Sequence, residues 1–317
     1  MRPNTPAAAR RVPFLHSPAL RAAALLTAAL ALGACRHVPA PSGGALPPPA
    51  TGAPAATVPA DDNLNAVLWL QRSMEYRALS ESIFRAATER LDAALADPAW
   101  DALVPAERSA AGDSRGLPPA VILDIDETVL DNSAYQARLV ADGNEFSDPA
   151  WDAWVEERKA IAVPGAVAFT RAAAEKGITV FYISNRSAAL AEATLANLRS
   201  EGLPVQHAEV FLGLGLQVPG CEQAGSGKTC RRQLVGRGHR VLMQFGDQLG
   251  DFAQPSANTP QQHAALHAGH RDWFGARWWV LPNPTYGSWE SAAFNNDWRL
   301  PRSDRRAAKR EALRLDR

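Results

Sequence analysis

The chain has 317 residues, 33 basic and 33 acidic side chains, and 46% hydrophobic residues, which is enough for one large domain or two average ones. A formal net charge of zero excludes a protein that binds nucleic acid polymers through bulk positive charge. Nine tryptophans and 21% charged residues argue against a chain that is disordered throughout.

The first 34 residues have the composition of an export signal. Basic residues precede an uncharged apolar run at 22–32, whose 11 residues are too few to cross a hydrocarbon core of about 30 Å. This order, with small residues at the exit, is typical of a secretory signal. The sequence Leu-Gly-Ala-Cys at 32–35 resembles a bacterial lipoprotein cleavage box, which implies that Cys35 becomes the lipidated first residue. An ordinary signal peptide with an incidental cysteine is the alternative.

Arg36 follows the cysteine, and in lipoproteins the lack of an aspartate there favours the outer membrane. We therefore expect an exported protein, anchored by its lipid at the outer membrane and facing the periplasm. Residues 35–60 are rich in Ala, Pro, Gly, Ser and Thr, which predicts a flexible tether. The chain is thus divided into a signal peptide at 1–34, a tether at 35–60 and a folded domain at 61–317.

The folded domain opens with helical periodicity. Apolar residues recur near a period of 3.6 between Asn63 and Leu95, which predicts a helix. The apolar run from Ala120 to Asp126 predicts a buried strand that ends in acidic residues. Residues 131–162 have a mixed composition and are interpreted as an insertion.

Strands and helices alternate in the rest of the chain. Helices are predicted at 164–176, 187–200 and 228–235, and strands at 178–183, 209–212, 240–245 and 277–281. This alternation predicts an α/β fold with a mainly parallel central sheet and helices on both faces. The basic residues from Arg302 onwards alternate with acids and predict a solvated helix or a frayed end.

Polar side chains follow four of these strands. They are Asp124 and Asp126 after the first strand, Ser184, Asn185 and Arg186 after the second, Lys228 beyond the third, and Asp247 and Asp251 after the fourth. Ligands in parallel α/β sheets bind beyond the carboxyl ends of the strands. We therefore expect these side chains to meet at one edge of the sheet.

The clustered aspartates indicate metal-assisted phosphoryl transfer. Asp124 and Asp126 share a face because side chains two apart in an extended chain point the same way. With Asp247 nearby, the carboxylates would repel one another unless a cation lies between them. Oxygen ligands without His or Cys suit Mg²⁺. A carboxylate is ionised at neutral pH, so an aspartate can attack phosphorus without an activating base.

Four segments in chain order resemble the motifs of the haloacid-dehalogenase (HAD) superfamily. They are Val121–Asn132, Tyr182–Arg186, Lys228 and Gly246–Phe252. The combination is most similar to the class C, or DDDD, acid phosphatases, with further support from residues 65–71, 163–166 and 281–290. The resemblance covers about residues 63–300. It implies an HAD-like Rossmannoid fold with a small, mostly helical cap, formed by residues 131–162 and the N-terminal helices.

The resemblance also implies roles for the four aspartates. Asp124 would be the nucleophile that forms an aspartyl-phosphate. Asp126 would be the general acid and then the base for the attacking water. Asp124, Asp247 and the backbone carbonyl of Asp126 would bind Mg²⁺, and Asp251 would act through water or orient the other ligands.

Ser184 and Lys228 complete the implied catalytic set. Ser184 would hold a phosphate oxygen, and Lys228 would neutralise the charge of the phosphate and the nucleophile. Relatives often carry two lysines directly before an arginine pair, whereas Lys228 stands alone, three residues before Arg231-Arg232. Lys228 is therefore the candidate, although it does not align with those lysines.

Four further residues are candidates for substrate binding. Asn185 and Arg186 belong to the second motif, and Trp151 and Tyr286 match positions where relatives stack an aromatic leaving group. This match implies nucleoside monophosphates and aryl phosphates as substrates. Core or rim packing is the alternative for the two aromatic residues, because aromatic side chains bury a large area anyway.

The loop around Lys228 lies between two cysteines. If Cys35 is acylated, Cys221 and Cys230 remain, and an exported compartment permits a disulfide between them. We expect this bridge, and two free thiols are the alternative.

Two other patterns indicate different functions but fail on their details. The segment 225–229 looks like a nucleotide-binding P-loop, but Glu222 stands where the motif needs its first glycine, and no apolar strand runs directly into it. His263, His267 and His270 have a plausible zinc spacing, but a solvated helix face is the favoured interpretation.

The leading hypothesis is a Mg²⁺-dependent acid phosphatase that hydrolyses small phosphomonoesters. Clustered carboxylates raise one another's pKa and a general acid must hold a proton, so we expect a mildly acidic pH optimum. One alternative is a non-catalytic surface lipoprotein that binds a ligand on an HAD scaffold. Another is a phosphotransferase, which would share the aspartyl-phosphate. The sequence leaves the oligomeric state open, with a homodimer among the options.

Overall fold

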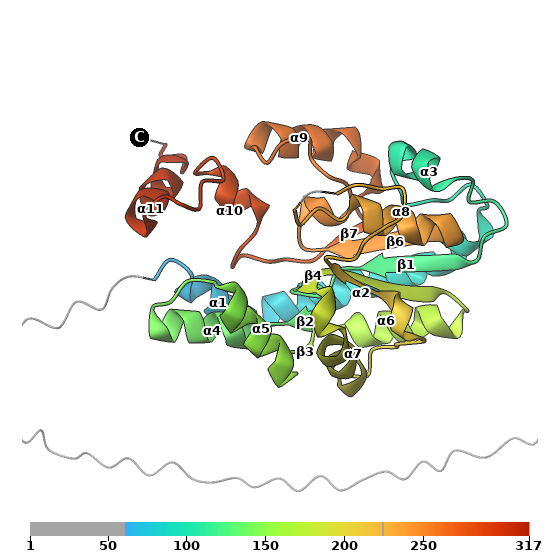
Figure 1. The fold of residues 1–317 in the computed structure, drawn as a ribbon, viewed down its shortest axis with the longest axis horizontal. Coiled ribbons are helices and arrows are strands. Elements are labelled where there is room, and N and C mark those ends of the chain that lie inside the picture. The colour runs from blue at the N-terminus through green and yellow to red at the C-terminus, as the bar shows by residue number, and fades with distance from the viewer. Residues whose placement is uncertain (1–60, 224, 317) are drawn as a thin grey trace, which may run out of the picture. The chain divides into compact units, whose positions relative to one another are not determined.

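The computed structural model describes residues 61–223 and 225–316, where a parallel sheet lies between two layers of helices (Figure 1). The sheet has five strands in the order β5-β4-β1-β6-β7, and every neighbouring pair is parallel. The strands are β1 (Pro119–Leu123), β4 (Thr179–Ser187), β5 (Phe211–Leu214), β6 (Arg240–Gly246) and β7 (Trp278–Val280). The predicted α/β fold with a mainly parallel central sheet is confirmed.

Helices cover both faces of the sheet (Figure 1). One layer contains α2 (Met74–Ala96), α6 (Ala166–Glu175) and α7 (Ala191–Ser200), and the other contains α3 (Pro105–Ala111), α8 (Thr229–Gly238) and α9 (Pro260–Gly269). Short 3₁₀ turns are η1 (Ala188–Leu190), η2 (Ala208–Val210), η3 (Leu249–Asp251) and η4 (Arg271–Trp273). After β1 the chain crosses one face of the sheet, and after β6 it crosses the other face. The carboxyl ends of these neighbouring strands therefore border the crevice where open parallel sheets bind ligands.

An aromatic cluster ties two helices to the end of β6. The ring centroid of Phe245 on β6 lies 4.5 Å from that of Phe169 on α6 and 5.4 Å from that of Phe84 on α2. The centroids of Phe84 and Phe169 are 5.8 Å apart. All three side chains are buried. Because protein interiors are close-packed, this contact fixes the position of β6 directly before Gly246 and Asp247.

The single helix predicted from Asn63 to Leu95 is instead two helices, α1 (Leu64–Arg72) and α2. Ser73 between them is extended, and its Oγ accepts a hydrogen bond from the backbone N–H of Tyr76 at 3.0 Å. This N-cap satisfies a donor at the start of α2 that no helical carbonyl reaches. Apolar periodicity continues across the break, so the pattern alone gave no sign of it.

The insertion between β1 and α6 starts and ends in a small antiparallel pair. β2 (Leu130–Asp131) pairs with β3 (Ile161–Ala162), and α4 (Ser133–Asp142) and α5 (Asp148–Glu157) lie between them in the chain. Helix α1 packs on α4, so the N-terminal helix joins the insertion. The structure therefore has the small, mostly helical cap that the sequence predicted, on a two-stranded stem.

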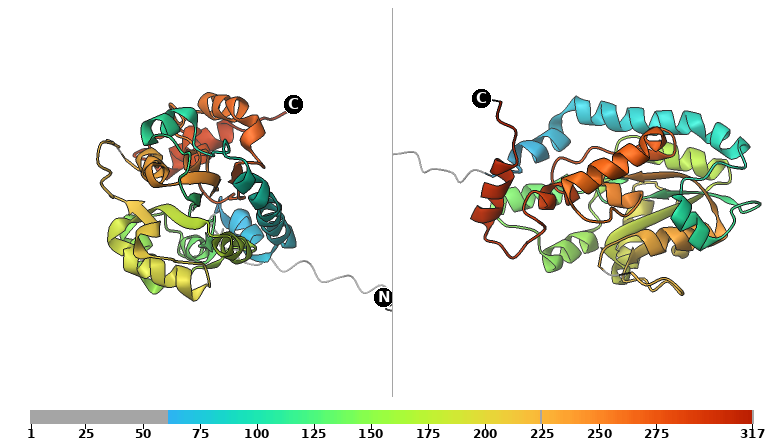
Figure 2. Two further views of the ribbon diagram at one scale, coloured as in Figure 1. Left: turned by 90° about the vertical axis from the view of Figure 1, so that its right-hand side faces the viewer. Right: turned by 90° about the horizontal axis from the view of Figure 1, so that it is seen from above.

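The last helices, α10 (Ser288–Ala292) and α11 (Arg302–Glu311), lie at the same end of the molecule as α1 and α4 (Figures 1 and 2). The tail that was expected to be a solvated helix or a frayed end is a helix whose residues are mostly exposed. Its Arg305 is buried over the rings of Phe294 and Trp298, and it donates two hydrogen bonds of 2.8 Å to Glu145. These contacts hold α11 to the loop between α4 and α5.

The signal, the tether and the lipidation site Cys35 lie outside the described residues. Within the described part of the chain, no helix combines the length and the apolar character that crossing a membrane requires.

Candidate active site

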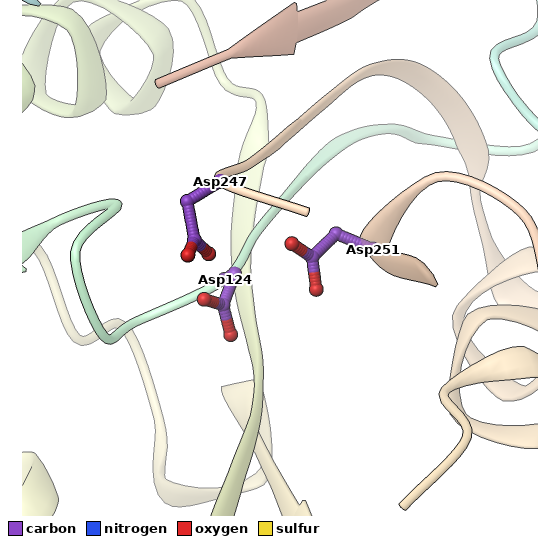
Figure 3. Close-up of side chains that lie close together, drawn as sticks. All are labelled: Asp124, Asp247 and Asp251. Atoms are coloured by element: carbon purple, nitrogen blue, oxygen red, sulfur yellow. The ribbon is translucent and has the colours of Figure 1, made fainter. Parts of the chain in front are cut away.

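Three aspartates meet at the carboxyl edge of β1 and β6. Asp124 follows β1, and its backbone N–H donates to the carbonyl of Phe245 on β6 at 2.9 Å. Asp247 directly follows β6, and Asp251 closes the 3₁₀ turn η3. One carboxylate oxygen from each lies within 4.8 Å of the others. Figure 3 shows the three side chains directed toward one another, so the parallel pairing of β1 and β6 assembles the predicted acidic cluster.

The carboxylates of Asp247 and Asp251 are each held by a neighbour. Asn283 donates from Nδ2 to Asp247 at 2.8 Å, and the backbone N–H of Gln248 donates to Asp251 at 2.9 Å. Gly246 allows Asp251 to come close, because a Cβ at position 246 would lie 2.3 Å from the Asp251 carboxylate. Only glycine fits there without displacing the carboxylate.

Lys228 joins the cluster directly before α8. Its side chain is buried, and Nζ donates to Oδ1 of Asp124 and, at 2.7 Å, to Oδ1 of Asp251. One cation thus bridges two carboxylates. This placement differs from that of a P-loop lysine, because the contacts of Nζ are with the acidic side chains.

The loop that carries Lys228 is fixed from two sides. Arg231, which is buried, donates to the carbonyls of Gly227 at 2.8 Å and Ser184 at 2.5 Å, and so joins the loop to the second motif. Cys221 and Cys230 form a disulfide with a Cα–Cα distance of 5.6 Å. From the sequence, Arg231 was only a marker beside Lys228, because the direction of its side chain depends on how the loop folds.

Asp126 lies among donors from the cap stem and from β4. Its Oδ1 accepts hydrogen bonds from Nδ2 of Asn132 at 3.0 Å and from Nε of Arg186 at 2.9 Å, and Nη2 of Arg186 forms an ion pair with it at 2.8 Å. Its Oδ2 accepts from the hydroxyl of Ser184 at 3.1 Å. The second motif therefore reaches the first motif through Asp126.

A tight turn after β1 brings Asp126 and Asn132 together. Glu127 has a φ of 58°, in the left-handed region, which is a strained conformation for a residue with a side chain. Its buried carboxyl accepts from the backbone N–H of Asn132 at 2.9 Å and from the hydroxyl of Tyr286. Glu127, Asn132 and Tyr286 thus form one hydrogen-bonded unit, which contacts Asp126 through Asn132.

The four predicted substrate-binding residues lie around this unit. The ring of Trp151 is half-buried, with the Arg186 guanidinium 5.7 Å from its centroid. Asn185 is exposed, and its Oδ1 accepts from Arg231 at 2.8 Å. Tyr286 contacts Glu127, and Arg186 contacts Asp126 and Asn132. Their contact with substrate stays a prediction.

Burial changes the protonation of the cluster. Burial raises the pKa of Asp124 to about 7, with repulsion from Asp251 and Asp126 added and the charge of Lys228 opposing it. Burial, with Asp251 and Asp124, also raises the pKa of Asp247 well above its usual value. Burial alone would lower the pKa of Lys228. The two carboxylates that Lys228 contacts, Asp124 and Asp251, together raise it by more, so the net shift is upward.

The donor set fits a magnesium ion. Within residues 61–223 and 225–316, Asp124, Asp247 and Asp251 are the one group of three or more acidic, His or Cys side chains that could share a metal ion. All of their ligand atoms are oxygens, which Mg²⁺ prefers. The histidines singled out as a zinc pattern pack elsewhere: His267 lies 5.2 Å from the ring of Phe274, and His270 lies 4.8 Å from that of Trp278. Aromatic rings thus lie beside His267, on helix α9, which has no buried residue, and beside His270, which directly follows that helix.

The fold and the site together define an α/β protein of the HAD type, with an Asp-x-Asp pair, a buried lysine and an aspartate triad at the switch point of the sheet. The family profile described as HAD superfamily, subfamily IIIB (acid phosphatase), matches residues 50–289. The chain belongs to this family.

Solved and curated relatives agree with this membership. The class C acid phosphatase from Bacillus anthracis is 32% identical, with a TM-score of 0.68, and the match covers 80% of this chain and 97% of that chain. A structure of the same phosphatase with tungstate bound matches equally well. The stem 28 kDa glycoprotein of Glycine max is 28% identical over 166 residues, or 52% of this chain and 58% of that protein. Acid phosphatase 1 of Solanum lycopersicum is 26% identical over 172 residues, or 52% and 57%. The chain thus spans little more than half the length of these curated relatives.

Proposed function

We propose that the protein is a Mg²⁺-dependent acid phosphatase that hydrolyses phosphomonoesters through an aspartyl-phosphate on Asp124. The observation that carries the proposal is the position of Asp124, within 4.8 Å of Asp247 and Asp251 and in contact with Lys228. Family membership and the similarity to the B. anthracis phosphatase support it. Tungstate, which that phosphatase binds, is a tetrahedral oxyanion like phosphate.

The residues of the site divide the reaction between them. An oxygen of Asp124 forms a bond to phosphorus while the ester P–O bond breaks, and Asp126 gives its proton to the leaving oxygen. Asp126 then takes a proton from the water that attacks the aspartyl-phosphate, which releases orthophosphate and restores Asp124. Lys228 neutralises negative charge, and Ser184 holds a phosphoryl oxygen. Mg²⁺, held by Asp124, Asp247, Asp251 and the carbonyl of Asp126, would withdraw charge from the transferring group.

We propose nucleoside monophosphates and aryl phosphates as the substrate class. Trp151 lies beside Arg186, which contacts Asp126. Tyr286 contacts Glu127, which follows Asp126 in the sequence. An aromatic leaving group that accepts a proton from Asp126 would therefore come within stacking reach of both rings. Asn185, which is exposed, and Arg186 would contribute polar contacts.

The N-terminal sequence supports a lipid anchor at Cys35, which would keep the enzyme at the outer membrane, facing the periplasm. Labelled fatty acid should enter the protein in cells and be lost in Cys35→Ala. Incorporation that survives this substitution would contradict the anchor.

The function is tested by assaying the purified protein on p-nitrophenyl phosphate and AMP at mildly acidic pH. Release of orthophosphate should require Mg²⁺, stop with EDTA and return when Mg²⁺ is restored. A folded, Mg²⁺-loaded protein that releases no phosphate from either substrate would support a ligand-binding lipoprotein instead.

A further inference from the structure

A buried hydrogen-bond chain leads from the cap helix α5 to Asp126. The indole N–H of Trp154 donates to Oδ1 of Asn132 at 2.8 Å, and Nδ2 of Asn132 donates to Oδ1 of Asp126 at 3.0 Å. Trp154 is 2% exposed and Asn132 is 0% exposed. Neither residue was assigned a role from the sequence, although Asn132 is the last residue of the first motif.

The donors around Asn132 allow its amide only one orientation. The Trp154 indole and the Arg186 guanidinium have no acceptor atom, so the amide oxygen must face them. The amide nitrogen then faces Asp126 and the carbonyl of Leu130. The backbone N–H of Asn132 is held separately, by Glu127. Trp154, with the shorter of the two contacts, and Arg186 together determine which end of the amide meets the carboxyl of Asp126.

This arrangement gives the two carboxylate oxygens of Asp126 different hydrogen-bond partners. Oδ1 accepts one hydrogen bond from Asn132 and one from Nε of Arg186, and it also forms an ion pair with Nη2 of Arg186. Among the described residues, Oδ2 has one hydrogen-bond partner, the hydroxyl of Ser184, which can turn and accept a hydrogen bond instead. A proton on Asp126 therefore belongs on Oδ2, because Oδ1 is occupied by donors.

We propose that Asn132 and Trp154 are positioning residues, which fix the rotamer of Asp126 and so aim its Oδ2 proton at the leaving group. The inference rests on the proposed phosphatase function and assigns the cap helix α5 a part in catalysis. As the bond from Asp124 to phosphorus forms and the ester bond breaks, the leaving oxygen takes the proton from Oδ2. Without the Asn132 contact the carboxyl is held by Arg186 and Ser184 alone, its rotamer is less firmly fixed, and proton transfer at this step is slower.

Proton transfer matters most when the leaving group is basic, which gives the test a specific readout. Phenolate is a far more basic leaving group than p-nitrophenolate, although the two rings fill nearly the same space. In Asn132→Ala, kcat/KM for phenyl phosphate should fall about tenfold or more beyond the fall for p-nitrophenyl phosphate. Trp154→Phe keeps an aromatic ring but removes the N–H, and should give the same effect in smaller measure.

Trp278→Phe is the matched control. Trp278 is also buried, and its indole N–H donates to the carbonyl of Ala102 at 2.9 Å, which is not one of the groups that contact Asp126 or Asn132. This variant should leave the ratio of the two substrates unchanged even if it lowers stability. Equal falls on both substrates in folded Asn132→Ala and Trp154→Phe, or no fall at all, would overturn the proposal. Wild-type protein inactive on both substrates would instead show that the phosphatase function itself is wrong.

Discussion

At the scale of single residues, the contacts of each carboxylate determine what it can do. Asp124 contacts Lys228, Asp126 contacts Asn132 and Arg186, and Asp247 contacts Asn283. These three aspartates therefore have different surroundings at one edge of the sheet. This difference allows one of them to act as a nucleophile and another to carry a proton.

Gly246 offers a test of how tightly the cluster is packed. In Gly246→Ala the added Cβ would lie 2.3 Å from the Asp251 carboxylate and push it away from the cluster. The Mg²⁺ concentration needed for half-maximal activity should rise by about 10–100-fold, as for other changes to the residues that orient metal ligands. Gly269→Ala is a suitable control, since nothing lies within 4 Å of a Cβ there. Equal Mg²⁺ requirements in both variants would argue against Asp251 as part of the metal site.

At the scale of elements, helix α11 and the segment just before α1 reinforce the cap. Arg302, Arg305 and Arg306 on α11 pair with Asp61, Glu145 and Asp62, which belong to the N-terminal segment and to the loop between α4 and α5. Charge alternation predicted a helix here but not these partners, because they lie far away in sequence.

Two arginines on α11 distinguish a buried contact from a surface one. Arg305 is 9% exposed over the rings of Phe294 and Trp298, whereas Arg306 pairs with Asp62 at the surface. Arg305→Ala should lower the free energy of unfolding by about 1–3 kcal/mol, because packing, ring contacts and hydrogen bonds are lost together. Arg306→Ala should change it by less than about 0.5 kcal/mol. Chemical denaturation measures both, and similar losses would show that Arg305 contributes no more than a surface pair.

At the scale of the whole molecule, the acidic cluster links stability to pH and to Mg²⁺. The pKa of Asp124 is about 7 in the fold, against 3.8 for an unperturbed aspartate. Between these values the native state holds the proton more tightly than the unfolded chain, so metal-free stability falls as the pH rises through this range. The Mg²⁺ that we propose for this site would compete with that proton and bind best once the proton has left.

Mg²⁺ should therefore raise the melting temperature more at about pH 7 than at about pH 5. Thermal unfolding with and without Mg²⁺ at the two pH values measures this difference. Asp124→Asn should reduce the difference, because an amide does not titrate in this range. A Mg²⁺ effect that is larger at the lower pH would contradict the link.

The sequence predicts most of this molecule but not all of its contacts. Apolar runs that end in Asp124, Ser184 and Asp247 were sufficient to predict the strands and the edge where they meet. The break at Ser73 was not visible, because apolar periodicity continues across it. The roles inferred for Asn132 and Arg231 were missed, since side-chain direction there depends on the left-handed turn at Glu127 and on a folded loop.

The most direct test of the central claim is turnover of Asp124→Asn, compared with the wild-type protein on p-nitrophenyl phosphate and AMP with saturating Mg²⁺. Circular dichroism confirms that the variant is folded. Because the amide cannot form the aspartyl-phosphate, both activities should disappear, by a factor of about 10³ or more. Folded Asp124→Asn that still hydrolyses either substrate at a rate near that of the wild type would contradict the assignment of Asp124 as the nucleophile.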